Sequence, residues 1–256
     1  MSDLSLIMNP DLLAFVASIA LLASYHLYLR IQLRRNPHYT IQSVNNTARA
    51  AWVDNIMANS NKDVLAVQTL RNSTMAATFL ASTAVLLIIG VLNMSHFGAA
   101  QASAAVQAIG DARPPVLSLR LLKEVPLLLD LFGAFFFFSL AIRMYNHVGY
   151  LINTGGHPSS PSNPSYVAQL LNRGGSYYSL GMRCYYLSVP FVFWLFGPAF
   201  LFAASLGLIV VLYHVDRAPD SLGIKVIEDE GRGFGVLGSK ERFVTPLATG
   251  LRDKAA

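Results

Sequence analysis

The sequence predicts an all-α integral membrane protein built as a four-helix bundle. Hydrophobic residues make up 54% of the 256-residue chain and charged residues only 13%, whereas soluble domains are about one-quarter charged. Each of four long apolar segments approaches or exceeds the ~20 residues that a helix needs to cross a hydrocarbon core. These segments are residues 12–29, 74–94, 126–142 and 186–212. We therefore expect a membrane domain over residues 1–216 and a polar tail over 217–256.

The first apolar segment is expected to be a retained membrane anchor. A cleaved signal peptide carries positive charge before its apolar core, but no Lys or Arg precedes Arg30. Pro10 and Asp11 suit the first turn of a helix, because proline lacks an N–H that would be unpaired there and a carboxylate favours the helix dipole.

The connection between the first two spans predicts an amphipathic helix on the cytoplasmic side. Within residues 44–58, an apolar stripe recurs at every fourth position. It consists of Ala48, Trp52 and Ile56. Trp52 suits the headgroup region, where its ring is buried and its indole N–H stays hydrated.

A single helix is expected to run from this connection into the second span, because no Gly or Pro follows Asp63 until Gly90. Arg71 lies at the point of membrane entry. A long Arg side chain can extend its charged head to lipid phosphates. We interpret Arg71 mainly as such an anchor, with substrate binding as the alternative.

Small residues at four-residue spacing mark two helix faces. Ala77 and Ala81 form one face in the second span. Ala199, Ala203 and Gly207 form the other in the fourth span. Small residues let helix backbones approach, which matters in lipid because the hydrophobic drive between helices is absent there. We interpret both faces as packing surfaces within the bundle, with a dimer interface as the alternative.

Asp130 is the polar candidate inside the membrane, since it is the one acidic residue within an apolar segment. An intramembrane carboxylate is costly and is by default a functional hypothesis. Lys123 precedes Asp130 by seven residues, which places both side chains on nearly the same helix face. We expect a mainly structural pairing of Asp130 with Lys123 or Arg120. Proton or cation binding is the alternative.

Basic residues in the short loops predict the orientation. The connections between spans one and two and between spans three and four carry nine basic and two acidic residues. The positive-inside rule assigns both connections to the cytoplasm. Both termini and the loop at Ser95–Pro115 would then be external, in a bacterial inner membrane. The net charge of +5 is attributed to this topology and to lipid headgroups, and a nucleic-acid partner is not expected.

Six histidines prompt the question of haem or metal binding. In this topology His26 and His147 lie near the cytoplasmic boundary, and His96 and His214 lie near the external one. A histidine pair at each face is what a two-haem b-type cytochrome requires. No HxxxH, HExxH or CxxCH pattern occurs, however, and histidine at an interface is ordinary. We expect no cofactor and keep haem or metal ligation as the alternative.

No catalytic motif stands out. The glycine-rich stretch at Gly231–Gly235 lacks the strand–turn–helix context of a dinucleotide loop, and neither a Walker A motif nor a GxSxG elbow occurs. The single cysteine, Cys184, excludes an intrachain disulfide.

Two segments resemble a known family. One is Trp52–Leu92, which includes the run from Asp63 to Ser82, and the other extends from Arg183 to Pro198. Both are similar to signature blocks of an uncharacterised membrane family, the domain of unknown function numbered five hundred and ninety-nine. The resemblance covers about residues 12–216 and implies a multi-pass membrane protein. It implies no activity, ligand or catalytic residue.

The expected function is that of a non-enzymatic membrane protein, either a helper or scaffold subunit or a small transporter. Its expected partners are the lipid bilayer and either a second copy of the chain or a larger membrane complex. The alternative is a haem- or metal-dependent redox protein built on the histidine pairs.

Overall fold

The described residues of this computed structural model are 10–109, 116–154 and 163–219. The chain divides into one unit at Met1–Ala218 and a second at Pro219–Ala256. Only Pro219 of the second unit is among the described residues, so the predicted polar tail lies almost wholly outside them. The described part of the first unit contains helices and no strand.

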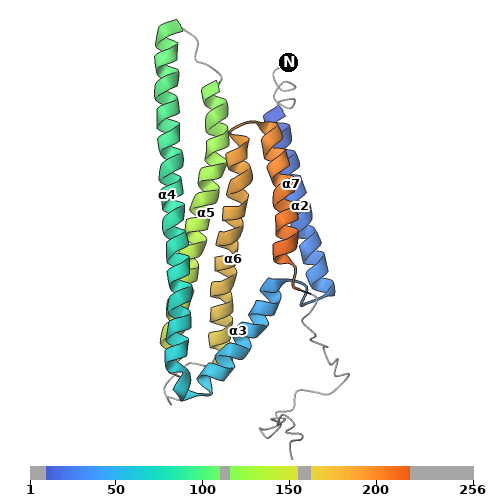
Figure 1. Ribbon diagram of the computed structural model, residues 1–256, viewed down its shortest axis with the longest axis vertical. Helices are drawn as coiled ribbons and strands as arrows, with labels where there is room; N and C mark the ends of the chain where they lie inside the picture. Colours follow the sequence, from blue (N-terminus) through green and yellow to red (C-terminus); the bar gives the residue numbers. More distant parts are fainter. Residues whose placement is uncertain (1–9, 110–115, 155–162, 220–256) are drawn as a thin grey trace, which may run out of the picture. The chain divides into compact units, whose positions relative to one another are not determined.

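Six α-helices build the described part of the first unit (Figure 1). They are α2 (Pro10–Arg35), α3 (Ile41–Met57), α4 (Asp63–Ile109), α5 (Val116–Leu151), α6 (Pro164–Trp194) and α7 (Pro198–Asp216), with a short 3-10 turn at Ser60–Lys62. Four stretches have the length and composition of a membrane span: Pro10–Arg35, Asp63–Ser95, Lys123–Leu151 and Pro198–Asp216. The prediction of an all-α multi-pass membrane protein is confirmed, as are the helix between the first two spans and the uninterrupted helix from Asp63.

The helices form two groups that meet at α6. The first contains α4, α5 and α6, and in the second α2 lies against α7, which also contacts α6 (Figure 1). α3 packs on α6, where Asn172 donates a hydrogen bond of 3.1 Å to the carbonyl of Asn46. Val53 and Ile56 of α3 are buried in one cluster with residues of α4, α5 and α6. Burial of this apolar face stabilises the docked position of α3.

The fourth predicted span, residues 186–212, is two helices and not one. α6 ends at Trp194 and α7 begins at Pro198. Gly197 between them has a φ of 152°, which glycine adopts without the strain that a Cβ would cause. Pro198 starts α7, where its missing N–H costs nothing. The prediction of one continuous span is wrong because this Gly-Pro pair reverses the chain, and α6 takes in much of the connection predicted before it.

This reversal determines where the chain leaves the first unit. Trp194 at the end of α6 donates a hydrogen bond of 3.1 Å to Asp11 at the start of α2. Just beyond the other end of α2, the N–H of Ala218 donates to the carbonyl of Tyr39 at 3.0 Å. The start of α2 and Ala218 therefore lie at opposite ends of the α2–α7 pair. The described chain therefore passes between these two ends once more than predicted. The side on which each terminus lies stays a prediction, because residues 1–9 and 220–256 are outside the described part.

α4 is longer than the sequence predicts. The loop expected at Ser95–Pro115 is helical as far as Ile109, and residues 110–115 lie outside the described part. Alanines are frequent in this stretch, and alanine is the strongest helix former. At 1.5 Å per residue, the 47 residues of α4 extend about 70 Å, more than twice the ~30 Å of a hydrocarbon core. α4 therefore projects beyond the membrane.

The two faces of small residues have different environments. Ala77 and Ala81 of α4 are buried, with exposures of 0% and 6%. On α7 the buried residues are larger for the most part, and they are Leu201, Ser205, Leu208 and Leu212. The predicted packing residues of this helix, Ala199, Ala203 and Gly207, are exposed. Their predicted role inside the bundle is wrong, because α7 packs on α2 through its leucines.

Candidate functional site

A cavity of about 740 Å³ lies between α3 and the helices that it crosses. This volume is within the range typical of small-molecule sites. One face of α3 lines it with Gln42, Asn45, Ala48, Arg49 and Trp52. The opposing polar and aromatic lining consists of Thr69, Ser73, Tyr145, Tyr178, Ser179, Arg183, Tyr186 and Asp216. The cavity thus combines hydrogen-bonding groups with aromatic surface.

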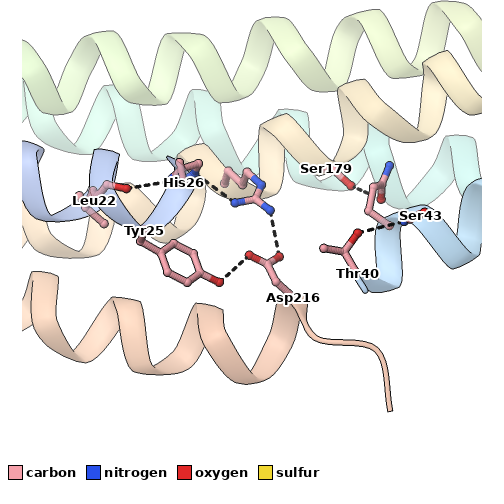
Figure 2. Close-up of polar contacts among 9 residues, drawn as sticks. Leu22, Tyr25, His26, Thr40, Ser43, Ser179 and Asp216 are labelled. Atoms are coloured by element: carbon pink, nitrogen blue, oxygen red, sulfur yellow. Dashed lines mark hydrogen bonds and ion pairs between the residues drawn. The ribbon is translucent and has the colours of Figure 1, made fainter. Parts of the chain in front are cut away.

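Asp216, the last residue of α7, joins three helices at one side of the cavity. Its carboxylate accepts a hydrogen bond of 3.0 Å from the hydroxyl of Tyr25 in α2. It also forms an ion pair of 2.9 Å with Arg183 in α6. Figure 2 shows the Tyr25 hydroxyl and the Asp216 carboxylate pointing toward each other. Hydrogen bonds to a charged acceptor are roughly twice as strong as neutral ones, so these contacts hold the end of α7 in place.

Arg183 also contacts His26, and the partners of that ring determine its tautomer. Nδ1 of His26 lies 2.9 Å from the carbonyl oxygen of Leu22. A carbonyl only accepts, so Nδ1 carries the proton. Nε2 then accepts a hydrogen bond of 3.1 Å from the Arg183 guanidinium. Both ring nitrogens of His26 are therefore engaged within the bundle.

The start of α3 is positioned by local hydrogen bonds. Thr40 caps the helix, since its side chain accepts a hydrogen bond from the N–H of Ser43 (Figure 2). Ser179 of α6 donates a hydrogen bond of 2.8 Å to the side-chain oxygen of Gln42. The side-chain nitrogen of Gln42 is buried and has no acceptor among the described residues. One donor at this side of the cavity is thus left without a partner there.

Arg49 of α3 lies directly against the backbone of α6 at Gly175. A Cβ at position 175 would come within 1.6 Å of Nη1 of Arg49, so the absence of a side chain there makes room for the guanidinium. Nη1 is buried and has no hydrogen-bond acceptor among the described residues. No carboxylate in that part of the chain forms an ion pair with Arg49.

The charged groups of the cavity do not balance. Its charged lining residues are Arg49, Arg183 and Asp216, and Asp216 is already paired with Arg183. Burial lowers the pKa of the Arg49 guanidinium, but arginine remains protonated in proteins because its ordinary pKa is above about 12. A buried charge without a partner is costly. The cavity is therefore suited to a negatively charged group.

Comparison with known sequences gives the family. A family model described as a protein of unknown function, DUF599, matches residues 13–221. The chain belongs to the DUF599 family. The resemblance seen in the sequence is thereby confirmed. The matched residues include all the helices that line the cavity. Searches of curated proteins and of solved structures found no match.

One histidine of this DUF599 chain, His214, does not lie as predicted. His214 precedes Asp216 by two residues, so it lies at the same end of the bundle as Tyr39 and not at the opposite end. It is exposed, as is His147 on α5. The side chain of His96 lies outside the described part of the structure. The prediction that His214 lies at the end opposite the connection between the first two spans is wrong, because α7 runs back toward the α3 end.

Asp130 and Lys123 do not pair with each other. Nζ of Lys123 lies 2.7 Å from the carboxylate of Asp11 at the start of α2, so the predicted Lys123–Asp130 pair is wrong. The carboxylate of Asp130 lies near the thiol of Cys184 in α6. Its Oδ2 is buried and has no partner among the described residues. The side chain of Arg120, the other predicted partner, lies outside the described part.

Trp52 and Arg71 occupy different environments. Trp52 is half-buried, packs against the cluster that includes Val53, and lines the cavity. Arg71 is exposed on α4, as a membrane anchor would be, and does not line the cavity. From the sequence, Arg49 is only one of the basic residues that predict the orientation, and no binding role is predicted for it. The adjacent glycines Gly174 and Gly175 could have indicated a close approach to a helix.

Proposed function

We propose that this DUF599 protein is a non-enzymatic membrane protein that holds a small solute between α3 and α6, and that it acts as a small transporter. The observation that carries this proposal is the cavity of about 740 Å³ with polar and aromatic walls. Buried polar atoms nearly always have a partner. A purely structural subunit would gain nothing from a cavity in which buried donors are left without one.

A packed aromatic layer next to the cavity supports transport over simple surface binding. Phe138 of α5 contacts Tyr178 and Tyr185 of α6, with ring centroids 5.6 and 5.4 Å apart. Tyr178 is also part of the cavity wall. A solute in the cavity would thus be separated from the rest of the bundle by side chains that can change rotamer. Gating around a fixed site is one way in which transporters alternate access to the two sides of the membrane.

We further propose that the α3 end faces the cytoplasm of a bacterial inner membrane. Basic residues at this end support the orientation, because cytoplasmic loops carry an excess of Lys and Arg. They include Arg34 and Arg35 in the last turn of α2 and Lys62 before α4. The start of α2 would then be external, and Ala218 would be cytoplasmic.

Filling the cavity tests the proposed function. Ala48 and Ala51 are both exposed residues of α3, but only Ala48 lines the cavity. We expect native mass spectrometry of the protein purified in mild detergent to detect a bound small molecule in the wild type and in Ala51→Trp, but not in Ala48→Trp. Equal retention in both variants would contradict binding in this cavity, and so would the absence of any bound small molecule in wild type.

A further inference from the structure

We infer that the cavity binds an oxyanion, a phosphate or carboxylate group, on the guanidinium of Arg49. The inference rests on the proposed function and adds the chemical class of the ligand. Neither the family match nor the sequence assigns a binding role to Arg49, which lies away from the intramembrane Asp130 and from the exposed histidines.

The unpartnered groups of the cavity are donors. Nη1 of Arg49 and the side-chain nitrogen of Gln42 are both buried without an acceptor among the described residues, and both residues line the cavity. Positions 42 and 49 are seven residues apart in α3, so they lie on one face, two turns apart. A ligand that satisfies both must present acceptor atoms. A phosphate or carboxylate does so and also supplies the missing negative charge.

The geometry at Gly175 indicates that the guanidinium is held in position before a ligand arrives. The guanidinium fits against α6 because position 175 has no Cβ. The other cavity arginine, Arg183, is already used by Asp216 and His26. Arg49 is therefore the cation available to a ligand. Because its side chain is ordered in advance, less conformational entropy is lost on binding.

The rest of the lining describes the remainder of the ligand. Trp52, Tyr178, Met182 and Tyr186 provide apolar and aromatic surface in the same cavity. The ligand therefore combines an oxyanion with an apolar or planar part. The headgroup region of an anionic phospholipid and a soluble organic phosphate or carboxylate share this chemistry, and the experiment has one arm for each source.

The experiment measures thermal unfolding of the full-length protein with defined probes. In the soluble arm, inorganic phosphate is titrated into protein in a neutral detergent. In the lipid arm, nanodiscs of phosphatidylcholine with and without phosphatidylglycerol are compared. We expect the wild type to be stabilised in at least one arm, because a ligand that binds only the folded state raises the melting temperature. A response to phosphate indicates a soluble ligand, and a response to phosphatidylglycerol alone indicates a lipid.

Three variants separate Arg49 from general charge effects. Arg49→Gln should weaken the effective probe by about tenfold or more, the loss expected for charge-assisted hydrogen bonds. Gly175→Ala keeps the charge but displaces the guanidinium, and it should weaken binding similarly. Arg35→Gln removes an exposed charge at the same end and should change little. Without a probe, Arg49→Gln should unfold no earlier than wild type, since it loses an unpaired charge.

Several results would overturn the inference. One is an equal response of wild type and Arg49→Gln, and another is the absence of any wild-type response in both arms. An Arg49→Gln variant that unfolds early yet binds the probe normally would make Arg49 structural. A neutral small molecule found in the cavity by mass spectrometry would refute the oxyanion while leaving the proposed function intact.

Discussion

Removing the Tyr25 hydroxyl tests whether the end of α7 is held at the α3 end of the bundle. Tyr25 is 7% exposed, and its hydroxyl donates to Asp216 at 3.0 Å. The contact joins the middle of α2 to the last residue of α7. It therefore exists only if the chain reverses at Gly197.

The expected magnitude follows from the charge and the environment of this hydrogen bond. Double-mutant cycles on hydrogen bonds within membrane proteins average about 0.6 kcal/mol, and a charged partner roughly doubles the strength. Tyr25→Phe should therefore lower the free energy of unfolding by about 1.2 kcal/mol. Asp216→Ala should cost more, because it also removes the 2.9 Å ion pair with Arg183.

Equilibrium unfolding in mixed detergent micelles would measure these free energies. In an Asp216→Ala background, Tyr25→Phe should cost close to nothing, giving a coupling energy of about 1 kcal/mol. Tyr28→Phe is a matched control, because Tyr28 is three residues away and its exposed hydroxyl has neutral partners at 3.3 Å. Two results would refute the contact and the reversal. One is a Tyr25→Phe loss of unfolding free energy that is the same with and without Asp216, and the other is an equal loss in Tyr28→Phe.

Two further predictions concern topology and the intramembrane acid. In a Cys184→Ser background, Phe196→Cys at the reversal and Ala218→Cys should be labelled by an impermeant maleimide from opposite sides of the membrane. Labelling of both from one side would restore a single fourth span. Asp130→Asn should keep the free energy of unfolding within about 1 kcal/mol of wild type, because no described cation pairs with this buried carboxylate and removing a buried charge relieves its desolvation cost. A loss of several kcal/mol in the same unfolding assay would show that the ionised form is paired.

Hydropathy was sufficient for the fold class, because membrane spans are set by length and apolarity alone. Hydropathy gave the wrong boundary at residues 186–212, because the residues on both sides of Gly197 and Pro198 are apolar and form one continuous hydrophobic segment. The Gly-Pro pair is a recognised turn signal, and giving it more weight than hydropathy would have placed the break. The position of Ala218 at the α3 end follows from this one boundary.

The site could be predicted only in part. Helical spacing placed Trp52 on an apolar face, and it does pack inward. Contacts between different helices could not be predicted from the sequence. The spacing of Lys123 and Asp130 fits a pair on one helix face, yet Lys123 contacts Asp11 of another helix. The partners of a long side chain depend on which helices are neighbours. The same holds for Arg49, whose environment is set by Gly175, far away in the chain.

The meeting of the two helix groups at α6 has a mechanical consequence. α2 and α7 pack on each other, and α7 contacts α6 and also α3. At one end this pair is fastened by Asp11 to Lys123 and Trp194, and at the other end by Asp216 to Arg183. Apolar packing accompanies these polar contacts, since Phe15 stacks on Trp194 and α6 packs Tyr186 and Leu187 against the cluster that contains Leu208 and Leu212. A rocking motion of the α2–α7 pair would therefore have to break the Asp216–Arg183 contact and shift these apolar side chains against α6, and it would change the width of the cavity beside Asp216.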